Sequence, residues 1–298
     1  MKISAYVPCG ASLPVLEAGC FSMISVIIPT CERTESLARC LEQLAGAAEI
    51  IVSDDGRSSD TRQLISCRFP KVRWLQGPRR GPAANRNHGA RYASGEWLAF
   101  VDDDCIPDSA WLNEIAIGIP DAEVIEGKTV CLNRTNHPLE EVVENVTGGV
   151  LWSCNLAIRR GLFEKLGGFD EDFLEAGGED MEFALRIRQM KVPVFYAPTA
   201  IVYHPARRLT LSKWISRVFR LRWHLLYRLK ATQTRCATLS EVVDLFRVTA
   251  RTVRIQERIR LMQRAFQLIL HWILLPVLAP YLGFWEIKFR KQLSERRS

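Results

Sequence analysis

The chain has 298 residues, of which 48% are hydrophobic and 24% are charged. This length and balance suit one large domain or a domain with an appendage, and they argue against a disordered, collagen-like or coiled-coil chain. The formal charge of +7 is unevenly spread: residues 1–204 sum to −8, and residues 205–298, with 20 basic and 5 acidic side chains, sum to +15. An acid-rich body that favours cations therefore precedes a strongly basic tail.

The beginning of the chain carries no export signal that we can identify. Pro8, Pro14 and Glu17 interrupt the apolar run that such a signal needs. We expect residues 1–22 to be an extension, either disordered or preceding a true start at Met23. The 9 cysteines include no Cys-x-x-Cys pair, so they predict neither a disulfide framework nor a zinc site, and scattered thiols suit a reducing cytoplasm.

Short β-branched apolar runs alternate with helix-length segments in the first half of the chain. The runs predicted as strands are Ser25–Pro29, Glu49–Ser53, Val72–Leu75, Trp97–Val101 and Val124–Glu126. The segments predicted as helices are Glu35–Leu44, Asp60–Ser66, Ala83–Ala93 and Ser109–Ile117. Because apolar runs without polar alternation are buried on both faces, this order predicts an α/β fold with an open, mostly parallel sheet. Such sheets bind ligands at the carboxyl ends of their strands.

The pattern becomes less regular after about Cys131. The elements predicted there are a polar loop over 133–149, a strand at Leu151–Arg159, a helix at Asp180–Gln189 and strands at Val192–Tyr196 and Ala200–Tyr203. Beyond His204 the pattern is helical and rich in arginine. We therefore expect an α/β body over 23–204, whose pattern changes at about residue 131, followed by a helical tail over 205–298.

Two acidic clusters follow strands of the predicted sheet. Asp54 and Asp55 follow the second strand, and Asp102, Asp103 and Asp104 follow the fourth. Carboxylates this close repel one another unless a cation joins them, and a hard divalent ion suits oxygen ligands. Asp102 and Asp104 are two residues apart on extended backbone, so they could hold Mg²⁺ or Mn²⁺ on one side. The alternative is a solvated acidic turn.

Three further motifs accompany these clusters. They are Pro29-Thr30-Cys31-Glu32, Gly81-Pro82-Ala83-Ala84-Asn85-Arg86-Asn87 and Gly177-Gly178-Glu179-Asp180. Taken together, the motifs resemble those of the inverting nucleotide-sugar glycosyltransferases of family 2, which have the GT-A fold. The resemblance covers about residues 24–204, and it implies that the body is a catalytic domain with a nucleotide-binding half over about 23–130 and an acceptor half over about 131–204. It implies a metal-dependent enzyme that moves a sugar from a nucleoside diphosphate to a hydroxyl acceptor.

The resemblance also implies a set of donor-binding residues. The residues that would hold the base and the ribose are Pro29, Thr30, Glu32, Asp54 and Asp55. Arg86 would help to hold the nucleotide, and a surface ion pair is the alternative for this arginine. The triplet Asp102-Asp103-Asp104 matches the family's Asp-x-Asp motif, whose last Asp binds the metal while the others address ribose and sugar. Cys31 departs from the family, since many members have an aromatic residue there that stacks on the base.

The Glu179-Asp180 pair resembles the family's Glu-Asp motif, whose Asp acts as general base. Asp180 is the predicted base and Glu179 the second candidate, with an ordinary acidic first turn of a helix as the alternative. Inversion requires one carboxylate to take the proton of the acceptor hydroxyl as that oxygen attacks the anomeric carbon. The Gly-Gly pair before them allows the backbone to approach a substrate closely.

Acceptor and metal roles are implied for a few more residues. Gly177, Gly178 and Trp152 are predicted on the acceptor side, although Trp152 could equally be a core residue. His204, which ends the predicted body, resembles the histidine that some GT-A enzymes add to the metal shell. A packed or capping histidine is its alternative. The predicted metal ligands are therefore Asp102, Asp104 and His204.

The tail combines basic and apolar residues. Residues 205–264 hold 15 basic and 3 acidic side chains, interleaved with Trp214, Phe219, Trp223, Leu226 and Leu229. Helical spacing of these residues favours an anionic lipid surface, and no nucleic-acid motif accompanies them. The uncharged stretch Leu268–Trp285 contains two prolines, so an interfacial or re-entrant helix is expected rather than a span, with a cover for the body or a dimer contact as alternatives.

These expectations combine into an inverting transferase at the cytoplasmic face of the membrane, acting on a cell-envelope glycan or a lipid-linked saccharide. Three alternatives stay open: a retaining GT-A enzyme, a sugar nucleotidyltransferase, and a noncatalytic protein that binds nucleotide sugars. A nucleotidyltransferase would favour a loop with Gly and Lys after the first strand, and Pro29 to Arg33 has neither. The base, sugar and acceptor depend on pocket shape rather than on motifs.

Overall fold

The computed structural model describes residues 23–44, 46–47, 49–135, 137–232 and 259–296. The strands of its main sheet are β1 Ile24–Thr30, β2 Glu49–Asp54, β3 Arg73–Gln76, β4 Trp97–Phe100, β5 Ile106–Pro107, β6 Val124–Leu132, β8 Leu156–Arg159 and β9 Val194–Pro205. Their order is β3-β2-β1-β4-β8-β6-β9-β5. The strands β3, β2, β1 and β4 run parallel to one another, and β6 runs parallel to β9. The strand β8 is antiparallel to β4 and β6, and β5 is antiparallel to β9. The predicted α/β fold with a mostly parallel sheet is confirmed.

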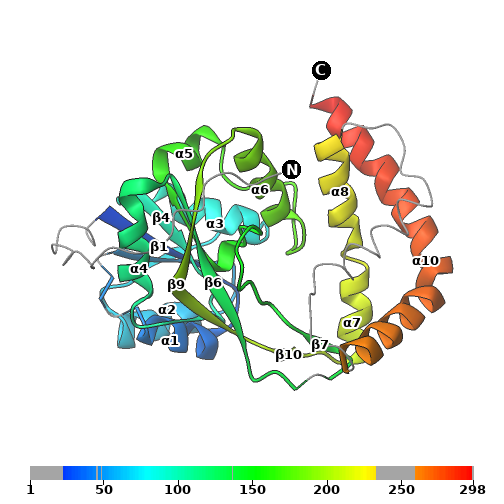
Figure 1. Cartoon of the computed structure of the whole chain (residues 1–298), viewed down its shortest axis with the longest axis horizontal. Helices are drawn as coiled ribbons and strands as arrows, with labels where there is room; N and C mark the ends of the chain where they lie inside the picture. Colours follow the sequence, from blue (N-terminus) through cyan, green and yellow to red (C-terminus); the bar gives the residue numbers. More distant parts are fainter. Residues whose placement is uncertain (1–22, 45, 48, 136, 233–258, 297–298) are drawn as a thin grey trace.

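Helices cover both faces of this sheet (Figure 1). The helices α1 Thr34–Glu42, α2 Asp60–Arg68 and α4 Trp111–Gly118 pack on one face, and α3 Pro82–Arg91, α5 Arg160–Lys165 and α6 Glu179–Gln189 pack on the other. In β1, Val26 and Ile28 belong to the first core and Ile27 belongs to the second. The strand is therefore buried on both faces, as its unbroken apolar run predicts.

The predicted strand Leu151–Arg159 is wrong in its first half. β8 begins only at Leu156, because Ser153–Asn155 form a short 3-10 helix. The side-chain amide of Asn155 donates to the carbonyls of Lys128 at 2.9 Å and Ala200 at 3.0 Å. Asn155 thereby satisfies backbone acceptors beside an irregularity in the sheet, which a continuous strand could not do.

The two strands predicted at 192–196 and 200–203 form one strand, β9. Its pairing with β6 shifts register between Gly127 and Lys128, and the strand continues through this irregularity. A β-bulge of this kind bends a strand without ending it. The predicted polar loop over 133–149 also contains one short strand, β7 Glu140–Glu141, which pairs with β10 Arg207–Arg208.

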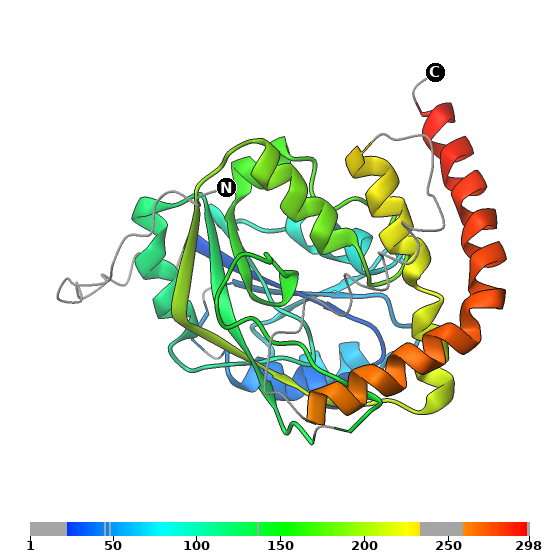
Figure 2. The ribbon, with the colours of Figure 1, turned by 45° about the vertical axis from the view of Figure 1, so that its right-hand side comes forward.

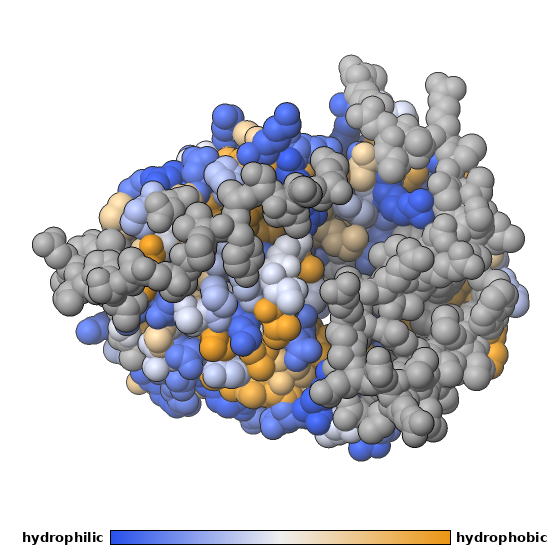
Figure 3. Space-filling view, in the orientation of Figure 1, coloured by the Kyte–Doolittle hydropathy of each residue, from blue (hydrophilic) through white to orange (hydrophobic). Residues whose placement is uncertain are grey.

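Among the described residues, the sheet is followed by the helices α7 Leu211–Val218, α8 Leu221–Thr232 and α10 Ile259–Glu295. They form a third core with Phe173, in which Trp223 and Leu278 are almost completely buried. In both ribbon views α8 lies between α6 and α10 (Figures 1 and 2). The space-filling view shows hydrophilic residues over most of the described surface of one face (Figure 3).

Within the described residues, no helix combines the length and the apolar character that crossing a membrane requires. The long helix α10 contains Pro276 and Pro280. Residues 1–22, for which an extension is predicted, lie outside the described residues.

Candidate active site

The carboxyl ends of β1 and β2 are joined to the aspartates that follow β4. Thr30 ends β1; its carbonyl accepts a hydrogen bond from the Asp55 backbone N–H at 2.9 Å, and its hydroxyl donates to Asp103 at 2.6 Å. The side-chain amide of Asn85 donates to the carbonyls of Thr30 and Ser53. Both acidic clusters therefore meet at one edge of the sheet, as the parallel order of the strands predicts.

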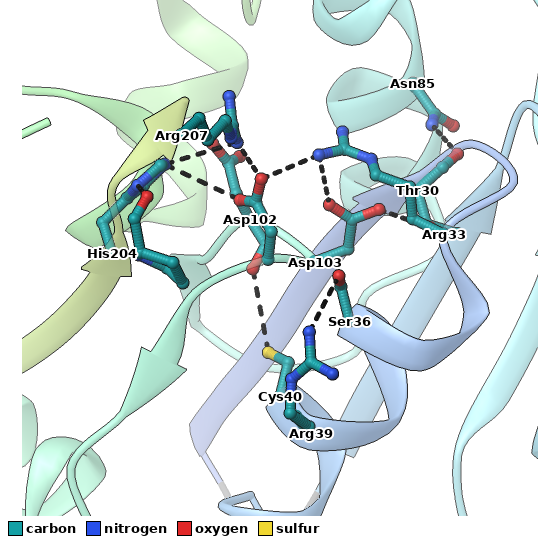
Figure 4. Close-up of polar contacts among 12 residues, drawn as sticks. Thr30, Arg33, Ser36, Arg39, Cys40, Asn85, Asp102, Asp103, His204 and Arg207 are labelled. Carbon is teal, nitrogen blue, oxygen red and sulfur yellow. Dashed lines mark hydrogen bonds and ion pairs between the residues drawn. The ribbon is translucent and has the colours of Figure 1, made fainter. Parts of the chain in front are cut away.

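Arg33 and Arg207 contact the second and third aspartates that follow β4 (Figure 4). Arg33 lies 3.2 Å from an Asp103 oxygen and 2.8 Å from an Asp104 oxygen, and Arg207 forms an ion pair with the same oxygen of Asp104. Burial raises the pKa of Asp103 to about 6. The sequence motifs predict neither arginine as a site residue, and the only signal for Arg33 is that it directly follows the Pro29–Glu32 motif.

Asp104 and His204 present a donor set that fits a divalent cation. Within the described part of the chain, the grouping of possible metal ligands consists of Asp104, Cys105 and His204. Asp104 Oδ1 is buried without a hydrogen-bond partner and lies 3.7 Å from His204 Nε2. A hydrogen bond with Cys154 and burial hold the pKa of the Cys105 thiol well above its usual value, which makes it a poor ligand.

The imidazole of His204 is prepared for the same role. Its Nδ1 lies 3.0 Å from the Pro205 carbonyl, which can only accept, so Nδ1 carries the proton. Nε2 keeps its lone pair, toward which Arg207 donates at 3.4 Å. Burial lowers the pKa of His204, which favours the neutral form that binds metals. Asp102, predicted as a further ligand, forms an ion pair with Arg86 at 2.8 Å, and its metal role stays a prediction.

Arg86 connects the aspartates after β4 to the carboxylates of α6. It is 5% exposed, and its guanidinium lies 2.8 Å from Asp102 and 3.4 Å from Glu179. Burial acts to lower the pKa of Arg86, but the negative charges of Asp102, Asp180 and Glu179 outweigh this effect and raise the pKa above its usual value. The sequence predicts Arg86 as a nucleotide-binding residue, but it does not indicate this link between the two carboxylate groups.

The two carboxylates that open α6 have different surroundings. Glu179 is 3% exposed and accepts a hydrogen bond from the Gly177 N–H at 2.7 Å. Asp180 Oδ1 has no hydrogen-bond partner. Burial and the charge of Glu179 raise the pKa of Asp180 to about 7, against the opposing effects of Arg86 and the Ser153 hydroxyl. Asp180 is therefore the carboxylate with an oxygen free to accept a proton near neutral pH.

The first acidic cluster contains one internal and one half-buried carboxylate. Asp54 is 1% exposed and accepts hydrogen bonds from the Gly56 N–H at 2.8 Å and the Trp74 indole N–H at 3.3 Å, so it shapes the loop after β2. Asp55 accepts from the Arg79 N–H at 2.8 Å, and burial raises the pKa of its carboxyl group. Their predicted contacts with a nucleotide stay predictions.

The remaining predicted residues lie on either side of this edge. Pro29 is inside β1, while Cys31 is exposed and Glu32 has a φ of 53° and accepts from the Arg57 N–H at 2.9 Å. Trp152 is partly buried against the first core, which is the packing alternative considered for it.

The fold is one that nucleotide-sugar transferases share. The solved structure of GalNAc-T7 with UDP, GalNAc and Mn²⁺ matches this chain with a TM-score of 0.50 at 18% identity, covering 76% of this chain and 54% of that chain. The chain therefore has the GT-A fold. The model for Glycosyl transferase family 2 matches residues 25–124, and the model for Glycosyltransferase like family 2 matches residues 149–232. The chain belongs to the family 2 glycosyltransferases, as its motifs predict.

Two curated relatives illustrate the range of this family. The validoxylamine A glucosyltransferase of Streptomyces hygroscopicus subsp. jinggangensis is 27% identical over 222 residues, which cover 58% of this chain and 53% of that protein. The GalNAc(5)-diNAcBac-PP-undecaprenol beta-1,3-glucosyltransferase of Campylobacter jejuni is 34% identical over 90 residues, which cover 27% of this chain and 29% of that protein. The chain spans about half the length of the Streptomyces relative and less than a third of the Campylobacter relative.

Proposed function

We propose that the protein transfers a sugar from a nucleoside diphosphate to a hydroxyl group of an acceptor, with inversion at the anomeric carbon. The observation that carries the proposal is Asp180. Its Oδ1 has no hydrogen-bond partner, and its pKa of about 7 matches the demand on a general base at neutral pH. Glu179 is engaged with Gly177 and Arg86, which supports Asp180 rather than Glu179 as the base.

The proposed step is a direct displacement. Asp180 Oδ1 takes the proton of the acceptor hydroxyl while that oxygen forms a bond to the anomeric carbon of the donor sugar. The bond from this carbon to the diphosphate oxygen breaks on the opposite face, and the diphosphate departs with the electron pair. Arg86, buried between Asp102 and Glu179, fixes the spacing between the donor side and the base.

Asp104 and His204 would hold the metal, with Asp102 as a further candidate, and Mn²⁺ or Mg²⁺ fits a carboxylate and a neutral imidazole. A bound divalent cation supplies positive charge that stabilises the departing diphosphate. The Mn²⁺ and UDP in the GalNAc-T7 structure support this assignment. The orphaned Asp104 Oδ1 supports it independently.

We further propose an acceptor that belongs to a cell-envelope glycan or is linked to a lipid, used at the cytoplasmic face of a membrane. The Campylobacter relative is named for a PP-undecaprenol acceptor. On α10, Ile273, Val277, Phe284 and Ile287 are more than half exposed and recur at helical spacing. Together with the basic tail, this face suits an anionic lipid surface.

Replacement of the base tests the reaction. The Asp180→Asn protein should fold and bind donor, yet lose transfer by about 10³-fold or more, since an amide cannot take the proton. Turnover would be followed as release of the nucleoside diphosphate from a panel of nucleotide sugars with Mn²⁺, and binding as the donor-induced rise in Tm. Substantial turnover by this variant would remove Asp180 as the base.

Three measurements test the other parts of the proposal. Asp104→Ala should abolish the metal-dependent part of the donor-induced Tm rise while leaving the Tm of the free protein within a few degrees. The anomeric configuration of the product, read by NMR, decides between inversion and retention. Release of pyrophosphate instead of a nucleoside diphosphate would indicate a nucleotidyltransferase.

A further inference from the structure

The segment 169–178 leads from α5 into the first turn of α6, where Asp180 lies. Three of its four acidic residues, Asp170, Asp172 and Glu175, pair with basic side chains of the C-terminal region, whereas Glu171 pairs with Arg80 and Arg91 of the body. Lys230 of α8 lies 2.7 Å from Asp172 and also forms an ion pair with Asp170. One lysine thus connects α8 to two positions of the segment.

Asp172 is held from a second helix as well. Its side chain is 4% exposed, and it accepts a hydrogen bond from Gln292 at 3.0 Å and pairs with Arg296 at 2.6 Å. Gln292 lies in the last turns of α10 and Arg296 follows that helix directly. A buried carboxylate is stable only with such partners, so this part of the segment cannot move without separating charges.

Glu175, nearer to α6, is contacted by two arginines of the same helical unit. Arg222 forms an ion pair with it, and Arg220 Nε lies 3.4 Å away. The Arg222 guanidinium is fixed in turn, because it lies 4.9 Å from the ring centre of Trp223 and 5.0 Å from that of Trp285. The segment is therefore attached to a rigid aromatic cluster rather than to a mobile surface chain.

The last link is a direct contact between α8 and the glycine turn before Glu179. Gly178 has a φ of +121°, and a Cβ there would lie 2.8 Å from the Phe173 ring and 3.0 Å from the Trp223 carbonyl oxygen. Phe173 is completely buried, with its ring centre 6.3 Å from that of Trp223 and 5.9 Å from the Lys230 ammonium. The backbone of α8 thus bounds the space available to this turn.

We infer that α8 and α10 position the catalytic base, with Lys230 and Arg222 acting as positioning residues for Asp180. The inference rests on the proposed role of Asp180. The contacts reach the segment at Asp172, Glu175 and Gly178, the last of which lies two residues before the base. A displacement of about 1 Å at a reacting group lowers a rate by up to about 100-fold. The C-terminal helices are therefore part of the active unit and not only an attachment for it.

The test compares variants of Lys230 in the full-length protein. Lys230→Met keeps most of the apolar stem and removes both ion pairs, and it should lower kcat about tenfold while the donor KM stays within about twofold. Lys230→Arg should restore most of the lost kcat, because it returns the charge. The matched control is Lys213→Met on α7, an exposed lysine whose replacement should leave both constants unchanged.

Three outcomes would overturn the inference: a wild-type kcat for Lys230→Met, a rise of the donor KM in step with the fall of kcat, or no recovery in Lys230→Arg. If Lys230→Met does not fold, Glu175→Gln takes its place, since Glu175 is 41% exposed and its loss leaves the core intact. This variant should lower kcat about threefold. Wild-type kcat in Glu175→Gln would equally overturn the inference. Retained turnover in Asp180→Asn is a separate result, because it would remove the base assignment itself.

Discussion

Asp180 keeps one carboxylate oxygen without a hydrogen-bond donor, and burial and the neighbouring Glu179 both oppose its ionisation. These effects raise its pKa to about 7, whereas Arg86 and Ser153 keep it from rising further. A carboxylate in water loses its proton near pH 4 and is then a weak base. The arrangement therefore produces a stronger base that is still half deprotonated near neutral pH.

The pH dependence of kcat follows from this value. The base must be deprotonated to act, so kcat should fall as the pH decreases through about 7 and reach a plateau above about pH 8. A pH–rate profile with saturating donor and acceptor measures the midpoint. A midpoint near pH 4 would contradict the raised pKa of Asp180, or would mean that another group limits the reaction.

Glu179→Gln provides the matched control for that profile. Because the negative charge of Glu179 raises the pKa of Asp180, its removal should shift the acid limb of kcat to lower pH while activity on the plateau is kept within about tenfold. Loss of all activity in Glu179→Gln, with Asp180→Asn still active, would exchange the roles of the two carboxylates.

At the scale of elements, the turn before α6 decides where both carboxylates lie. Gly177 and Gly178 have φ values of +136° and +121°, a region that residues with a side chain rarely adopt. The strand β8 contributes from the other side, since its late start leaves Ser153 in a 3-10 turn beside Asp180. The glycine turn directly precedes the two carboxylates, whereas Ser153 is far from Asp180 in the sequence.

Gly178→Ala tests the turn. The backbone of an alanine at this φ would be strained by about 2 kcal/mol, and its methyl group would meet Phe173 and the Trp223 carbonyl. We therefore expect a lower Tm and a fall of kcat of at least about tenfold, with donor binding preserved. The control is Gly167→Ala, at a φ of +79° but with open space around it. It should cost about 1 kcal/mol of stability and leave kcat unchanged. Equal kcat in the two variants would show that the turn does not position the base.

At the scale of the whole molecule, charge and apolar surface are separated along the chain. The body over 1–204 carries −8 and the tail over 205–298 carries +15. The helix α10 carries four large apolar side chains that are more than half exposed, namely Ile273, Val277, Phe284 and Ile287. Although no described helix is suited to cross a bilayer, one that lies on an anionic surface needs only an apolar side and nearby cations.

Vesicle binding tests this proposal. The protein should sediment with vesicles of phosphatidylcholine and phosphatidylglycerol more than with phosphatidylcholine alone, and less at high salt. Replacing Phe284 and Ile287 by Ser should reduce binding by about tenfold or more, because that apolar area no longer enters the lipid. The control replaces Met190 and Val194, exposed apolar residues near the end of α6, by Ser. Equal loss in both double variants would contradict a role for α10.

The sequence by itself determined the α/β fold and the position of the candidate site. Unbroken apolar runs such as Val26–Ile28 require burial on both faces, and only a sheet between two helical layers provides it. Parallel strands then bring residues that follow them in sequence to one edge. For that reason the sequence alone predicts that the aspartates after β2 and β4 lie close together.

The tertiary structure alone decided which charges meet. Arg33 and Arg207 contact Asp104, Arg86 links Asp102 to Glu179, and Lys230 holds Asp172. These partners are mostly tens of residues apart, and their contacts depend on side-chain direction after packing, which local periodicity does not encode. The shifted pKa of Asp180 has the same origin, because it is set by burial and by the charges that packing brings around it.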